Sequence, residues 1–497
     1  MQVLTEFEGA EFGDKRLTKR LLSLVERLVV DPSASFPEAA GSDAALEATY
    51  RFFRNPTVTA QRILAPHVSA TLERCRAEQV VIVAHDTTEF SFSTPRAGLG
   101  RINDAGQGFF AHVALAISAD GSRRPLGVVG LNTFTRLEPP KRQKHTENIP
   151  EHERESYRWR ALAAEVGALT KGSAQAIHVM DSEADSYDLI AGIIDDEQRF
   201  VIRLKYDRWI RDEDGERVHL SEILPDLKGR FTRKVELSAR SAPHHQERGR
   251  KRNAGRTSRL ATLEFSACSI SFVAPSRANG KDDLELNLVC VNEVDAPAGA
   301  EPVSWLLVTS EPIGSIADIE RIVDAYRARW TIEELFKALK TGCAFEKRQL
   351  ESLPALLNAL AVFIPIAFEL LALRTAARTD PERPASTLLR PMQLLVLQRH
   401  KATRLPSRAT ARAALLAVAR LGGHIPNNGE PGWIVLGRGY QKLLDLEEGA
   451  RIALGDSVNP EKLTINPEAR AAPLGRSEFG RASPHAAPPT ASDEVRA

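Results

Sequence analysis

The sequence predicts an α/β protein whose core is a mixed sheet, with a β-rich insertion in the core and helical regions before and after it. Short apolar runs such as "QVVIVAHD" (79–86) and "AIHVMD" (176–181) have the composition of central strands covered on both faces. Segments with helical periodicity separate several of these runs, and this periodicity is lost between about 206 and 300. At 497 residues and 43% apolar content, the chain is long enough for two to four domains with sizeable cores.

The first part of the chain, residues 1–75, predicts a small helical domain. Helical runs such as "RLTKRLLSLVERLV" alternate there with the turn-rich "DPSASFPEAAGSD". Basic residues of this region are candidates either for phosphate contacts or for solvated helix faces, and the sequence leaves both open. They are Arg16, Lys19, Arg20, Arg51 and Arg54.

Residues 76–352 predict the α/β domain. Its first strand is expected to end at Asp86, and an antiparallel meander of two strands follows, joined by the turn "ADGSRR". A charged helix, a strand that ends at Asp181, a second helix and the strand "RFVIRLK" come next. The β-rich stretch 206–300 interrupts this domain, because the strand "SWLLVTS" and a helix from about Ser315 resume the α/β pattern after it.

The C-terminal part predicts a helical domain at 353–456 and a disordered tail at 457–497, which is rich in Pro, Ala, Ser and Gly. The most apolar stretch, "LPALLNALAVFIPIAFELLAL" (353–373), is long enough to suggest a membrane span. Polar residues and prolines, Asn358 and Glu369 among them, interrupt it, so buried helices are expected instead. The first residues are acidic and lack a continuous apolar run, so no secretory signal is expected.

The composition argues against two kinds of site. The net charge is only +1, from 66 basic and 65 acidic residues, so affinity for a polyanion must come from local clusters. The cysteines are scattered, without a CxxC pair or a nearby histidine set, which argues against structural zinc and a disulfide framework and favours reduced thiols in a cytoplasm. They are Cys75, Cys268, Cys290 and Cys343.

One predicted helix, "YRARWTIEELFKALKTG" (326–342), carries two adjoining stripes of side chains. The polar stripe has spacings of three, four, four and three residues and consists of Tyr326, Arg329, Glu333, Lys337 and Lys340. The apolar stripe, expected to pack against the core, consists of Ile322, Ala325, Ala328, Ile332, Leu335 and Leu339. Glu333 is therefore expected at the rim of the core, flanked by cations that can hold it ionised.

Three carboxylates are expected to form one cluster. Open sheets place ligands outside the carboxyl ends of their strands, so Asp86 and Asp181 meet if their strands are parallel neighbours, and the last helix can bring Glu333 to them. Such carboxylates repel one another and need a counter-charge, and all-oxygen ligands favour a hard divalent cation such as Mg²⁺. Two such ions about 4 Å apart would activate a water or hydroxyl and stabilise the leaving oxygen of a phosphodiester.

Each of these residues has a simpler alternative. Asp86 and Asp181 begin the sequences "DTT" and "DSEAD", which also suit turns and helix N-caps. Glu333 and Lys337 form a favourable i, i+4 pair, and lysines before a Thr-Gly stop suit a helix C-terminus. The alternatives do not explain why Tyr, Arg and Glu align at a core rim in a chain whose two apolar strands both end in aspartate.

Four residues of this helix match the YREK signature of the insertion-sequence-four family of bacterial DDE transposases, which includes the Tn-five transposase. They are Tyr326, Arg329, Glu333 and Lys340, with two, three and six residues between them. "HDTTEFSFS", "MDSEADSYDLI" and "WLLVTSEPI" resemble other blocks of that family in the right order. "FGDKRLTKRL", "ATYRFFRNPTV" and "PGWIVLGRGYQKL" resemble its terminal regions, so the resemblance covers about 10–450. Ser182 stands where many relatives carry arginine, so no role passes to that position.

The resemblance implies an RNase H-like catalytic domain and a DDE triad of Asp86, Asp181 and Glu333 that binds two Mg²⁺ ions, with Mn²⁺ as a possible substitute. It implies cut-and-paste chemistry by nicking, hairpin formation, hairpin opening and strand transfer. The partners would be the terminal inverted repeats of the protein's own element and target DNA, bound by a homodimer associated with the nucleoid in the cytoplasm, without a membrane. The N-terminal helical domain would bind DNA and the C-terminal one would support dimerisation.

The resemblance also implies DNA contacts. Tyr326, Arg329, Lys337 and Lys340 would lie along the DNA, with the tyrosine, arginine and second lysine gripping a phosphate near the hairpin.

Two tryptophans and one loop extend these expected contacts. Trp305 and Trp330 match positions that hold or stack on a flipped base, although core packing is the alternative. The stretch 240–259 has seven arginines or lysines against one glutamate. Arg250, Lys251 and Arg252 are its candidates for phosphate contact, and an exposed loop without a partner is the alternative.

Three functions are compatible with these residues: a Mg²⁺-dependent transposase, a non-catalytic DNA-binding inhibitor of transposition, and a plain Mg²⁺-dependent nuclease. Retention of all three carboxylates and of the YREK residues counts against the inhibitor. The nuclease would cut DNA without joining the ends.

Overall fold

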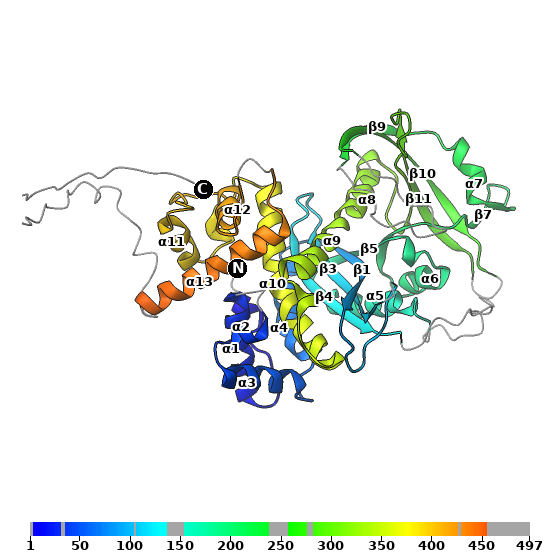
Figure 1. Ribbon diagram of the computed structural model, residues 1–497. Helices are drawn as coiled ribbons and strands as arrows, with labels where there is room; N and C mark the ends of the chain where they lie inside the picture. Colours follow the sequence, from blue (N-terminus) through cyan, green and yellow to red (C-terminus); the bar gives the residue numbers. More distant parts are fainter. Residues whose placement is uncertain are drawn as a thin grey trace, which may run out of the picture. The chain divides into compact units, whose positions relative to one another are not determined.

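The computed structural model describes residues 3–30, 35–103, 106–136, 154–237, 257–275, 282–425 and 429–454. Its described strands form one mixed sheet in the order β2-β3-β1-β5-β6-β12-β11-β10-β7-β8, with β4 on β3 and β9 on β10 (Figure 1). The strands are β1 (Val80–Phe92), β2 (Gly100–Arg101), β3 (Gln107–Ser118), β4 (Pro125–Phe134), β5 (Gln175–Met180), β6 (Arg199–Arg203), β7 (Trp209–Arg211), β8 (Arg217–His219), β9 (Phe231–Leu237), β10 (Arg259–Phe272), β11 (Leu284–Val294) and β12 (Ser304–Thr309). The predicted α/β class with a mixed sheet is confirmed.

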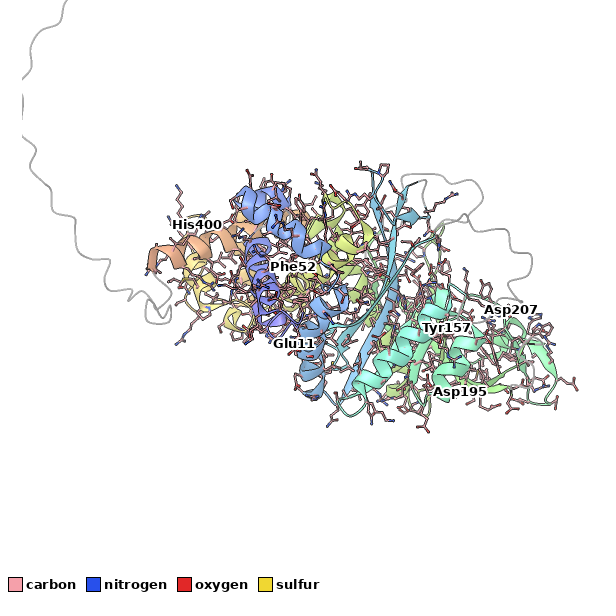
Figure 2. All side chains as sticks on the ribbon, turned by 90° about the horizontal axis from the view of Figure 1, so that it is seen from below. Glu11, Phe52, Tyr157, Asp195, Asp207 and His400 are labelled. Atoms are coloured by element: carbon pink, nitrogen blue, oxygen red, sulfur yellow. The ribbon has the colours of Figure 1, made fainter. Side chains whose placement is uncertain are left out.

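Helices cover both faces of the sheet. The α-helices are α1 (Lys15–Val30), α2 (Phe36–Ala40), α3 (Asp43–Arg54), α4 (Ala60–Arg76), α5 (Tyr157–Thr170), α6 (Tyr187–Asp195), α7 (Leu220–Ile223), α8 (Ile316–Ala328), α9 (Trp330–Lys337), α10 (Leu353–Thr379), α11 (Pro391–Arg399), α12 (Ala411–Leu421) and α13 (Trp433–Leu454). Figure 2 shows α5, marked by Tyr157 at its first residue, beside α6, which ends at Asp195.

The strand β1 is the centre of the sheet and departs from the prediction in its length. It pairs antiparallel with β3 and parallel with β5, which in turn pairs parallel with β6. The prediction that this strand ends at Asp86 is wrong, because β3 continues to pair with β1 as far as Phe92. The parallel pairing with β5 ends earlier, at Ala84 and Val179, so Asp86 lies just beyond the end of the parallel ladder.

The two faces of β1 are buried under different helices. Ile82 and Ala84 belong to the same core cluster as Ile322 of α8. Val81 and Val83 pack instead with residues of α5. Because side chains alternate along a strand, Asp86 faces the side of α8 and α9, whereas His85 and Thr87 face the side of α5.

The stretch predicted as a β-rich insertion, 206–300, contains the strands β7 to β11. They belong to the same sheet as the rest, because β11 pairs antiparallel with β12 and β12 pairs antiparallel with β6. The candidate residues Arg250, Lys251 and Arg252 lie outside the described residues.

The prediction of one continuous helix over 326–342 is wrong, because the helix is interrupted. The first segment, α8, begins with a capping box between Ser315 and Asp318 and ends at Ala328. At Arg329 the backbone N–H donates to the carbonyl of Tyr326, three residues back, and α9 then begins. A π-helical turn over Ala338–Gly342 follows α9. The apolar stripe from Ile322 to Leu339 is buried throughout, as predicted.

The apolar stretch 353–373 belongs to one long helix, α10. Within the described residues α10 is the one helix long and apolar enough to cross a membrane, and 94% of its most apolar window is buried inside the protein. Asn358 donates to the carbonyls of Phe53 and Val58 at 3.0 and 2.9 Å, which joins α10 to the N-terminal helices. The expectation of burial is confirmed, although one helix forms and Pro365 does not end it. The predicted tail, 457–497, lies outside the described residues.

Candidate active site

Two aspartates lie at the carboxyl end of the parallel strands. Asp181 directly follows β5 and caps a short 3-10 helix, with its Oδ1 accepting from the Glu183 N–H at 2.9 Å. Asp86 has a similar arrangement, because its Oδ1 accepts from the Thr87 N–H at 2.8 Å. Asp181 is thus the N-cap that the sequence suggests as an alternative, and this contact fixes one of its carboxylate oxygens.

Glu333 joins the aspartates through Arg329. The Arg329 guanidinium donates from Nη1 to Asp86 Oδ2 at 2.8 Å and from Nη2 to Glu333 Oε1 at 3.0 Å. Its side chain is only 7% exposed, so its charge depends on these carboxylates. Arg329, predicted as a phosphate ligand, is bound in this structure to two members of the predicted triad.

The pKa shifts show that the carboxylates share one electrostatic environment. Burial raises the pKa of Asp86 to about 7, Arg329 opposes this, and the negative charges of Asp181 and Glu333 add to the rise. Burial also raises the pKa of Glu333, again with Arg329 opposing and Asp181 adding to the rise. Each of the three carboxylates is therefore close enough for its charge to act on another.

The residue set fits a hard divalent cation by its chemistry. Its donors are carboxylate oxygens, which Mg²⁺ prefers, and one guanidinium neutralises only part of their charge. Within the described ranges no group of three or more His, Cys, Asp or Glu residues has the geometry of a formed metal site. Arg329 lies between Asp86 and Glu333 and pairs with both carboxylates.

The aromatic candidates lie in different environments. Tyr326 is buried, and its ring contacts that of Trp305 edge to face at a centroid distance of 5.5 Å. Burial raises the pKa of Tyr326, and Arg203 opposes this. Trp330 begins α9, is 56% exposed and lies 5.7 Å from the Arg329 guanidinium. Core packing, the alternative for both tryptophans, is therefore wrong for Trp330.

The two lysine candidates have separate contacts. Lys337 Nζ forms its direct ion pair with Glu334 Oε1 at 2.8 Å, and its charge also acts to lower the pKa of Glu333, the expected i, i+4 partner. Lys340 lies in the π-helical turn, where its Nζ is 5.7 Å from the Phe90 ring of β1. The extra residue of this turn shifts Lys340 out of the even helical stripe that the sequence suggests.

Three buried histidines behind the aspartates were not predicted from the sequence. His85, His112 and His178 come from β1, β3 and β5, and His85 Nε2 lies 2.9 Å from His178 Nδ1. Burial lowers the pKa of His112 to about 3 and that of His178 to about 4, so these rings are neutral. The sequence places one histidine in each of three apolar strands, which could have suggested this cluster. The spacing of the three histidines matches no known motif.

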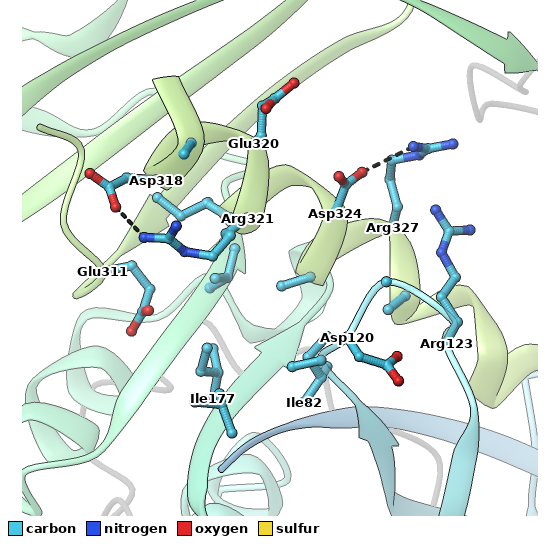
Figure 3. A pocket seen from close by; sticks show the side chains of 18 of the residues that line it. Ile82, Asp120, Arg123, Ile177, Glu311, Asp318, Glu320, Arg321, Asp324 and Arg327 are labelled. Atoms are coloured by element: carbon cyan, nitrogen blue, oxygen red, sulfur yellow. Dashed lines mark hydrogen bonds and ion pairs between the residues drawn. The ribbon is translucent and has the colours of Figure 1, made fainter. Parts of the chain in front are cut away.

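A cavity of about 710 Å³ lies at the other end of the strands, between α8 and the starts of β1 and β5 (Figure 3). Ile82 and Ile177 form part of its apolar wall. Charged residues surround them, including Asp324 and Arg327, which pair at 3.1 Å. This cavity contains none of the three triad carboxylates.

Two family models match the chain. Residues 3–58 match the transposase DNA-binding family, and residues 141–363 match the transposase DDE domain. The second match contains Asp181 and Glu333 and begins after Asp86.

A solved structure that the chain resembles is a piggyBac transposase synaptic complex with hairpin DNA, at 9% identity over 90% of this chain and 75% of that chain. The TM-score of this match is 0.35. The matches to a transposase DNA-binding domain and to a transposase DDE domain identify the chain as a DDE transposase, a metal-dependent enzyme of DNA cleavage and transfer.

Proposed function

We propose that this protein is a cut-and-paste transposase of the insertion-sequence-four family, which excises its own element through a hairpin intermediate and joins it to target DNA. The observation that carries the proposal is that Asp86 and Asp181 lie at the carboxyl ends of neighbouring parallel strands, and that Arg329 pairs with both Asp86 and Glu333, in a chain with a transposase DDE match. The YREK spacing supports the choice of this family, and two of its residues, Arg329 and Glu333, are paired at 3.0 Å.

The carboxylates are proposed to hold two Mg²⁺ ions, with Mn²⁺ as a substitute. When bound, such ions supply an activated water or 3′ hydroxyl and stabilise the leaving oxygen. The chain's own contribution is a fixed set of oxygen ligands, because backbone N–H groups orient Asp86 and Asp181. Arg329, released from Asp86 and Glu333, would then be available to bind a DNA phosphate through its planar fork of donors.

The hairpin step is proposed to use Trp330. Its indole is exposed beside Arg329, so a base that leaves the duplex near the bound phosphate could stack on it. Trp305 is less suited to this role, because it packs against Tyr326. It supports the position of Tyr326 near the carboxylates instead.

The partners are proposed to be the terminal inverted repeats of the element and its target DNA, bound by a homodimer in the nucleoid. The N-terminal region would bind the end DNA, in agreement with the transposase DNA-binding match over 3–58. The helical region 353–456 would provide the dimer contact, and the RNase H-like catalytic domain would span 76–352.

The test is incubation of the purified protein with Mg²⁺ and linear DNA that ends in the inverted repeats flanking its gene. Denaturing gels should show a nick, a hairpin and an excised fragment, and target plasmid should yield joined products. Asp86→Asn and Glu333→Gln should abolish all of them, whereas Glu165→Gln, at an exposed position of α5, should not. End binding without cleavage would identify an inhibitor, and cut but never joined DNA would identify a nuclease.

A further inference from the structure

The two catalytic aspartates share a feature that the triad itself does not explain. Each has its Oδ1 held by a backbone N–H, from Thr87 for Asp86 and from Glu183 for Asp181. The side chains of these same two residues, Thr87 and Glu183, bind one guanidinium, that of Arg158. A single side chain thus connects the two segments that orient the aspartates.

Arg158 lies in the first turn of α5 and uses its whole fork of donors. Nε donates to Thr87 Oγ1 at 3.2 Å, and Nη2 donates to Glu183 Oε2 at 3.2 Å. Nη1 donates to the Glu155 carbonyl at 2.8 Å, which anchors the guanidinium to the start of its own helix. Only arginine offers three donor groups in a rigid plane, so a lysine could not make these contacts together.

The surroundings of Arg158 hold it in place. Thr87 Oγ1 is also 2.9 Å from His112 Nδ1, which links the contact to β3. The next residue, Trp159, is buried and packs edge to face on His112 at a centroid distance of 4.4 Å. The Arg158 side chain is 14% exposed, so its position is set by packing as well as by hydrogen bonds.

The charge of Arg158 is placed behind the aspartates, opposite Arg329. Burial lowers the pKa of Arg158, and nearby carboxylates, first Glu155 and also Asp181, oppose this. Arg329 in contrast pairs directly with Asp86, at 2.8 Å. Arg158 touches none of the triad carboxylates, so it can stay in place when the site binds an ion.

We propose that Arg158 is a positioning residue that fixes the separation and orientation of Asp86 and Asp181, and so prepares them to bind divalent cations together. The inference rests on the proposed function, in that it takes these aspartates as metal ligands. Groups that orient metal ligands from behind commonly affect metal affinity by about 10- to 100-fold when removed. A purely structural arginine would affect the stability of the fold and leave that affinity unchanged.

The test compares full-length wild-type protein with Arg158→Gln and Arg158→Lys. Binding of Mn²⁺ is measured by isothermal titration calorimetry, with and without end DNA, and thermal unfolding is followed in parallel. Arg158→Gln should weaken Mn²⁺ binding about 10- to 100-fold, and Arg158→Lys should do so nearly as much because it keeps the charge but loses the fork. DNA affinity without metal should be unchanged, and raised Mn²⁺ should restore part of the cleavage.

Arg390→Gln is the matched control. The Arg390 side chain is 10% exposed and pairs with Glu447 in the C-terminal helices, so its loss should lower the unfolding temperature without changing Mn²⁺ affinity. Unchanged Mn²⁺ affinity in Arg158→Gln, with only a lowered unfolding temperature, would overturn the positioning role. Equal loss of Mn²⁺ affinity in Arg390→Gln would overturn it too.

The proposed function has a separate outcome in the same experiment. Wild-type protein that binds Mn²⁺ neither alone nor with DNA would refute the metal site and this inference with it. Wild-type protein that binds Mn²⁺ but never cleaves its end DNA would refute the proposed function, and the comparison of Arg158 variants would still decide the positioning role.

Discussion

The substitution Asp86→Asn should stabilise the fold while it abolishes catalysis, because the ionised Asp86 carboxylate is unfavourable in the metal-free site. Burial raises the pKa of Asp86 from an ordinary 3.8 to about 7, despite the ion pair with Arg329. The folded state therefore binds more protons than the unfolded state between these values, and stability falls as the pH rises from about 4 to 7. The full shift corresponds to about 4 kcal/mol.

The size of the stabilisation by Asp86→Asn depends on pH and can be measured. Asparagine resembles the protonated aspartate and can still accept a hydrogen bond from Arg329. The stability advantage of Asp86→Asn should therefore grow by about 2–3 kcal/mol between pH 5 and pH 8, and change little above that. Urea unfolding of both proteins in EDTA, at the two pH values, measures this difference. Added Mg²⁺ should stabilise only the wild type, because it binds the folded state through Asp86.

Two results would refute this reasoning. Asp86→Asn could prove less stable than the wild type at pH 8, which would mean that the ion pair with Arg329 outweighs the cost of burial. Alternatively the difference could be the same at both pH values, which would mean that Asp86 titrates near its ordinary pKa in the folded protein.

Three other predictions follow from the site and the core. Arg329→Gln should weaken cleavage of end DNA by at least about tenfold, because one charge-assisted contact to phosphate contributes about 1.5–3 kcal/mol. The same substitution should tighten Mn²⁺ binding measured without DNA, because Arg329 no longer pairs with Asp86 and Glu333. Trp330→Ala should keep the first nick and reduce hairpin formation about 10- to 100-fold on gels, whereas Ile316→Ala, at an equally exposed site, should reduce neither. Asn358→Leu should lower the free energy of unfolding by about 2–4 kcal/mol in urea titrations, because two buried carbonyls lose their donor; unchanged stability would contradict the role of this amide.

Much of the site could be predicted from local sequence, because its residues follow simple periodicities. The apolar stripe of α8 and α9 is buried, and this places Glu333 at the rim of the core. The order of strands along the chain was enough to suggest that Asp86 and Asp181 lie at one end of a parallel pair. Both inferences depend on the regular geometry of helices and strands, which sequence spacing describes well.

Other features depend on contacts between distant segments and could not be predicted from spacing. The strand that carries Asp86 continues because β3 is long enough to pair with all of it. Lys337 pairs with Glu334 in a helix that breaks at Arg329, a position where the sequence shows no glycine or proline. The role inferred for Arg158 requires two segments that are far apart in the sequence to meet at the start of α5.

The central claim is that Asp86, Asp181 and Glu333 converge to hold divalent cations. A crystal structure of the protein with end DNA and Mn²⁺, with anomalous scattering data, tests it most directly. We predict anomalous peaks among these three carboxylates, at about 2.0–2.3 Å from their oxygens, with Arg329 turned from Asp86 to a phosphate. Bound DNA without such a peak, with Arg329 still bridging Asp86 and Glu333, would contradict the claim.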